Sequence, residues 1–117
     1  MVIPELKHIY SSDLVRPNIP SDIEDCAVHL QAFIGPKGDD SEESFPFTVV
    51  TPTYLRRSQL PQWGRGLLIV PAFSWEVVEQ YLHRLIAHAS RPTWQESAAV
   101  LNMELNWEFE NYQPYEG

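Results

Sequence analysis

The chain has 117 residues, of which 44% are hydrophobic and 21% charged, as expected of one globular domain spanning residues 1–117. Its net charge of −8 repels phosphate backbones, so we do not expect nucleic acid as a partner. Every apolar run is too short to cross a bilayer, and the single cysteine excludes an internal disulfide framework and suits a reducing compartment. We therefore expect a cytoplasmic protein without membrane contact.

The first half of the chain is predicted to form three strands. A short alternating segment, Ile3–Tyr10, comes first. The segments Ala27–Ile34 and Phe45–Thr51 alternate apolar and polar side chains with the period of two that is typical of half-buried strands. The polar connection Gly35–Ser44 contains glycine and proline, so the pair is predicted to be a hairpin with a long loop.

The second half begins with a predicted short helix, Pro52–Ser58, because proline suits the first helical turn. A continuously apolar run, Leu67–Val70, is expected to be a strand covered on both faces. Helices are predicted at Trp75–His88 and Trp94–Met103, capped by Ser74 and Thr93, the latter in a capping box with Glu96. An apolar stripe on the first of these helices should face the sheet: Val78, Tyr81, Leu82, Leu85 and Ile86.

The chain closes with a predicted strand built around Trp107, Phe109 and Tyr112, with Glu108 and Glu110 between them. The order of elements predicts an α+β fold. We expect a mostly antiparallel sheet of about five strands, with two main helices packed on one face.

Charge is distributed unevenly along the chain. Residues 1–43 carry nine carboxylates against three basic side chains, whereas residues 56–91 carry five arginines against two glutamates. Residues 92–117 carry five glutamates and no base. This pattern favours a basic protein partner, which the acidic regions would attract. The alternative is that the carboxylates only maintain solubility.

The residues that most often carry chemistry form no recognisable catalytic set. His83 and His88 are five apart and do not share a helix face, and no pair of cysteines is present to hold zinc. Cys26 follows several acidic residues, which disfavour the reactive thiolate. We therefore expect no catalytic residue, metal or cofactor. The alternative is a small enzyme or ligand-binding domain that uses a pocket containing His8, His29 and Glu108, with the two histidines as neighbours across the sheet.

Three segments resemble one known family. They are the opening ELKHIYSSD, the central QAFIGPKGDDSEESFPFTVVTPTYL and the closing WEFENY, in that order over nearly the whole chain. Together they resemble the immunity protein 8 family of bacterial polymorphic toxin systems of the contact-dependent inhibition type. The chain departs from the family pattern at Tyr54, Asn111 and Pro46. The resemblance implies a cytoplasmic, non-enzymatic protein that binds and blocks the C-terminal domain of a cognate toxin. The toxin's activity and the oligomeric state stay open, with a nuclease as one candidate.

A binding hypothesis combines the charge pattern with this resemblance. The acidic side chains would face a basic groove on the toxin and, for a nuclease, would stand in for the phosphates of its substrate. The acids proposed to bind the toxin are Asp39, Asp40, Glu42, Glu43, Glu108 and Glu110. A second set, conditional on exposure, consists of aromatic anchors at Tyr54, Trp63 and Trp75.

Overall fold

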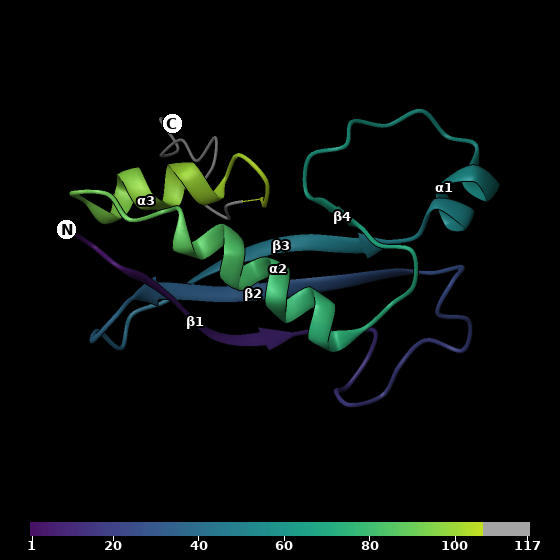
Figure 1. Cartoon of the computed structure of the whole chain (residues 1–117), viewed down its shortest axis with the longest axis horizontal. Coiled ribbons are helices and arrows are strands. Elements are labelled where there is room, and N and C mark those ends of the chain that lie inside the picture. Colours follow the sequence, from purple (N-terminus) through teal and green to yellow (C-terminus); the bar gives the residue numbers. More distant parts are fainter. Residues whose placement is uncertain (107–117) are drawn as a thin grey trace, which may run out of the picture.

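The computed structural model describes residues 1–106 and confirms the α+β fold. The strands are β1 (Pro4–Tyr10), β2 (Ala27–Pro36), β3 (Glu43–Val50) and β4 (Leu67–Ile69). The helices are α1 (Pro52–Ser58), α2 (Trp75–Ala87) and α3 (Trp94–Leu101). The sheet has the order β1-β2-β3-β4, with β1, β2 and β3 antiparallel and β4 parallel to β3 (Figure 1). The expected closing strand at residues 107–112 lies outside the described residues.

The β2–β3 hairpin is the centre of the fold, and its strand prediction is confirmed. Ala27 pairs with Val50 and Ile34 with Glu43, so the two strands stay in register over eight residue pairs. Alternate side chains of β2 are buried, as the period of two requires: Val28, Leu30, Ala32 and Ile34. Both strands extend further into the connection than expected, which shortens the loop to Lys37–Glu42.

The two main helices pack on one face of the sheet, as predicted (Figure 1). The Ser74 hydroxyl accepts a hydrogen bond from the Val77 N–H at the start of α2, and Thr93 accepts one from Glu96 at the start of α3. The core between helices and sheet includes Val78, Leu82 and Ile86 of α2 and Ala98 and Leu101 of α3. This layer covers the hairpin.

Two burial predictions were wrong. The β4 strand is not covered on both faces, because it is short, borders the sheet beside β3 within residues 1–106, and leaves Ile69 56% exposed. Tyr81 does not face the sheet but is 45% exposed. It lines a groove together with Leu67 and Leu68 of β4, on a part of the sheet that no helix among the described residues covers (Figure 1). Both errors concern the same region of the molecule.

Candidate functional site

The hairpin loop presents Asp39, Asp40 and Glu42 as exposed side chains, and we call these three residues the acidic loop. Its turn is held in place from β1, where the Lys7 ammonium group donates to the carbonyl oxygens of Asp39 at 2.9 Å and Pro36 at 3.3 Å. Gly38 adopts a φ of 83°, which suits a residue without a side chain. The acids therefore stand on an ordered frame.

The carboxylate of Asp39 is also part of that frame. Its Oδ1 atom accepts a hydrogen bond of 2.8 Å from the backbone N–H of Ser41. This bond, with a smaller contribution from the Lys7 charge, lowers the pKa of Asp39 below its ordinary value. Asp39 is thus firmly ionised at neutral pH, and the loop keeps its negative charge.

Glu42 lies beside a histidine on the neighbouring strand. Its Oε2 atom is 3.6 Å from Nδ1 of His8, and the His8 ring stacks on Phe33 with ring centroids 4.4 Å apart. His8 pairs with Phe33 and not with His29, which instead faces Thr48 at 2.9 Å. The prediction that the two histidines are cross-strand neighbours was therefore wrong, because β1 meets β2 in a register that separates them.

Glu43 differs from the acidic loop in its surroundings. It is the first residue of β3, and its Oε2 atom accepts a hydrogen bond of 2.8 Å from the indole Nε1–H of Trp94 in α3. This bond joins the hairpin to the helical layer, so the carboxylate of Glu43 connects two elements of the fold, whereas that of Asp39 bonds only within its own loop. Glu108 and Glu110, also proposed to bind the toxin, lie outside the described residues.

The three aromatic residues proposed as anchors differ in exposure. Trp63, in the loop between α1 and β4, is 94% exposed. Tyr54 is half-buried, with the Arg57 guanidinium 5.1 Å from its ring centroid. Trp75 is only 8% exposed and donates its indole N–H to the Asn18 carbonyl at 2.7 Å. Of the three, Trp63 alone is fully exposed, and its loop runs from α1 to β4, away from the acidic loop (Figure 1).

The residues of the alternative, enzymatic hypothesis are not brought together in the part of the chain that the structure describes. His29 lines a polar groove of about 280 Å³ between β1 and β3, but His8 does not, and Glu108 is outside the described residues. Burial first, and then the charges of Asp22 and Asp25, raise the pKa of the buried Cys26 thiol. Among residues 1–106, no group of three or more metal-binding side chains occurs.

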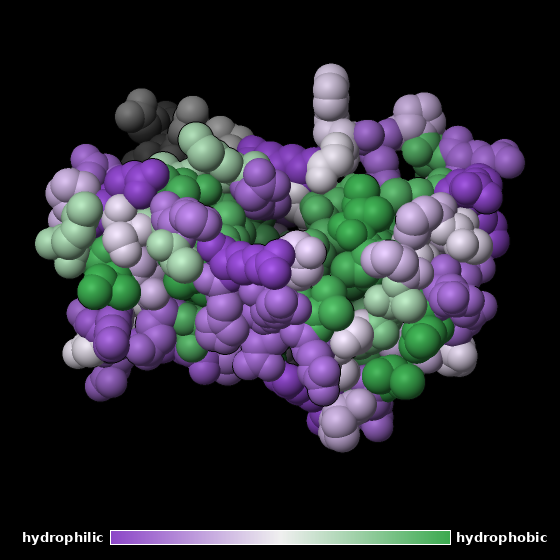
Figure 2. All heavy atoms as spheres, in the orientation of Figure 1, coloured by the Kyte–Doolittle hydropathy of each residue, from purple (hydrophilic) through white to green (hydrophobic). Residues whose placement is uncertain are grey.

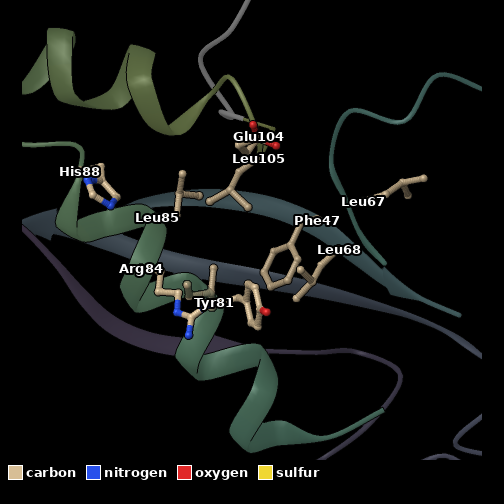
Figure 3. Close-up of a pocket in the computed structure, with 10 residues that line it drawn as sticks. Phe47, Leu67, Leu68, Tyr81, Arg84, Leu85, His88, Glu104 and Leu105 are labelled. Atoms are coloured by element: carbon tan, nitrogen blue, oxygen red, sulfur yellow. The ribbon is translucent and has the colours of Figure 1, made fainter. Parts of the chain in front are cut away.

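A second, apolar groove was missed by the sequence analysis. It lies between α2 and β4, has a volume of about 290 Å³, and we call it the α2–β4 groove. Figure 3 shows Phe47, Tyr81 and Leu105 around a common space, and Figure 2 shows hydrophobic atoms gathered over β4 on the same face. The residues that line it are Phe47, Leu67, Leu68, Tyr81, Leu82, Arg84, Leu85, His88, Glu104 and Leu105. These residues are spread over almost sixty positions of the sequence, so no local spacing pattern predicts that they line one groove.

A charged loop on a rigid hairpin and an open apolar groove are typical of a small protein-binding domain. The chain matches the family model described as Immunity protein 8 over residues 5–112, so it belongs to that family and the resemblance is confirmed. The family implies a non-enzymatic inhibitor of a cognate toxin. No curated protein and no solved structure matches the chain. Within residues 1–106, no helix is long and apolar enough to pass through a membrane.

Proposed function

We propose that the protein protects a bacterial cell by binding the C-terminal domain of its cognate toxin, and that the acidic loop contacts a basic surface on that domain. The observation that carries the proposal is the family match over residues 5–112. The family match indicates the class of partner. The carboxylates of the acidic loop are the reason for placing the contact there. In this proposal binding occurs in the cytoplasm and blocks the toxin without any chemical step.

The acidic loop suits this role for two physical reasons. Its three carboxylates project from a turn held by Lys7, so little conformational freedom is lost when a partner binds. They also add to a net charge of −8, which speeds the diffusional approach of a basic protein. We assign Glu43 to the fold instead of the contact surface, because its carboxylate is bound to Trp94.

A nuclease is the toxin class that best matches this surface. Enzymes that act on nucleic acids hold phosphate groups in basic grooves, and carboxylates can occupy the same positions. The acidic loop would then cover the substrate groove and exclude the nucleic acid. Trp63, exposed on the loop between α1 and β4, is proposed as a separate aromatic contact.

Binding kinetics test the assignment of the acidic loop. We expect the variant D39N/D40N/E42Q to associate with the cognate toxin domain about tenfold more slowly than the wild type. Its association rate should also depend less on salt, because fewer charges attract the partner. Stopped-flow or surface plasmon resonance measurements over a range of salt concentrations give both quantities.

A matched control separates local from overall charge. The variant D22N/E24Q/E76Q removes the same number of exposed carboxylates from positions outside the hairpin loop, in the segment before β2 and in the first turn of α2. We expect its association rate to stay within about twofold of the wild-type rate. Equal slowing in both variants would mean that only net charge matters, and no slowing in either would contradict the acidic-loop site.

A further inference from the structure

The rest of the described chain buries only part of the apolar stripe of α2. Val78, Leu82 and Ile86 are 6% exposed or less, whereas Tyr81 is 45% exposed and Leu85 is half-buried. Helices of globular proteins normally bury the whole of such a stripe. The uncovered part faces the α2–β4 groove, which indicates that another surface packs against it.

The floor and end of the groove are also apolar. Phe47 and Leu68 come from the neighbouring strands β3 and β4, and Leu105 follows α3. Figure 3 shows Phe47, Leu68 and Tyr81 directed into the same space. A volume of about 290 Å³ lies near the lower end of the range for ligand sites, enough for a few apolar side chains. The groove is thus shaped to receive side chains and not a flat surface.

Charged side chains border the groove on two sides. Arg84 lies in the last turn of α2 and His88 is the C-cap of that helix, while Glu104 lies near Leu105 on the other side (Figure 3). Among residues 1–106, Arg84 makes no ion pair, and its guanidinium lies 4.8 Å from the Tyr81 ring centroid. A carboxylate beside Arg84 and a base beside Glu104 would therefore complement this border and orient the occupant.

We propose that the α2–β4 groove is an apolar anchor site for the cognate toxin domain, which inserts an amphipathic segment with a carboxylate next to Arg84. The inference rests on the proposed function and adds the position and chemistry of a second contact. A protein partner is favoured because the chain belongs to an immunity family and because the groove opens on an exposed face. Apolar grooves bordered by charged side chains bind amphipathic helices, whose apolar face enters the groove.

The two sites should act on different steps of binding. Charges such as those of the acidic loop govern the rate of association, whereas buried apolar contacts govern the rate of dissociation. A change in the groove should therefore shorten the lifetime of the complex without slowing its formation. This difference is what separates the groove from the acidic loop in experiment.

The test compares two substitutions on α2. Tyr81→Glu places a charge among the apolar side chains of the groove, while His83→Glu adds the same kind of side chain at an exposed position outside the groove. We expect Tyr81→Glu to raise the dissociation rate about tenfold or more and to leave the association rate within about twofold. His83→Glu should leave the dissociation rate within about twofold of the wild-type value. Equal dissociation rates for both variants would overturn the proposal.

A measurement on the unaltered protein covers the case in which Tyr81→Glu fails to fold. Methyl groups of Leu68, Leu85 and Leu105 should shift in NMR spectra and show intermolecular contacts when the unlabelled toxin domain is added. The methyl groups of Val15, which is 73% exposed outside the groove, serve as the control. A complex in which the groove methyl groups are unchanged would overturn the anchor site while the proposed function stands. If no complex forms, the proposed function itself fails.

Other occupants give distinguishable results. A wild-type dimer that Tyr81→Glu converts to a monomer, measured by sedimentation, would assign the groove to a second copy of the chain. Contacts from the groove methyl groups to residues 107–117 in the isolated protein would assign it to the chain's own end. Either result would overturn a toxin anchor site.

Discussion

At the scale of single residues, acids that look equivalent in the sequence have different roles. Asp39 binds the backbone of its own loop, Glu42 lies beside His8, and Glu43 binds Trp94 from α3. Glu43 and Trp94 are fifty-one positions apart, so no local pattern identifies their contact. Two of these differences lead to measurable predictions.

The lowered pKa of Asp39 makes the loop sensitive to acid. Because the folded pKa is depressed, the carboxylate stabilises the loop above the ordinary value of about 3.9 and loses this effect as the pH falls through the folded pKa. We expect an NMR titration to place the Asp39 midpoint below about 3.9, with the Ser41 amide signal following it. In Asp39→Asn, the Ser41 amide should no longer follow that titration. A midpoint at or above the ordinary value would contradict the bond.

The contact between Glu43 and Trp94 predicts that substitutions at Glu43 and at Asp40 differ in effect: the first lowers stability and the second slows toxin binding. Glu43→Ala leaves the half-buried indole N–H without this acceptor and should lower the free energy of unfolding by about 1 kcal/mol or more. Asp40→Ala, at an exposed position in the loop, should leave the free energy of unfolding unchanged but slow toxin association. Urea unfolding measures the first quantity, and equal stability losses for the two variants would be the contrary result.

At the scale of elements, the hairpin turn depends on a close approach between backbones. A methyl group at Gly35 would overlap the carbonyl oxygen of Ser41, whereas one at Gly64 would meet nothing within 4 Å. We expect Gly35→Ala to lower the free energy of unfolding by about 1–3 kcal/mol. Gly64→Ala should change it by about 0.5 kcal/mol or less. Thermal and urea unfolding of both variants test this, and similar effects would argue against a tightly packed turn.

Elements with strong local signals could be predicted from the sequence, and those set by distant contacts could not. The period of two in β2 and the caps at Ser74 and Thr93 predicted a hairpin and two helices that the structure confirms. The apolar run of β4 was misjudged because such a run does not distinguish an edge strand from a central one. The α2–β4 groove was missed for a related reason, since it exists only where a helix, two strands and the residues after α3 meet.

At the scale of the whole molecule, the candidate surfaces are spread over different parts of a thin body. The principal extents are 41 × 37 × 23 Å; the acidic loop lies at one end of the long axis, and the loop that carries Trp63 runs from α1 at the other end back toward the middle (Figure 1). A standard interface buries about 800 Å² on each partner, a small part of this surface. One toxin domain is therefore expected to contact the acidic loop and the α2–β4 groove, and Trp63 only if the interface is larger.

The central claim is that this protein neutralises a toxin by binding it, and co-expression with the C-terminal domain of the cognate toxin tests it most directly. The account predicts that the wild-type protein restores growth and co-purifies with the toxin domain as a stable complex. Asp22→Asn should do the same, as a substitution away from the proposed contacts. Cells that die despite abundant folded protein, with no complex recovered, would contradict the account.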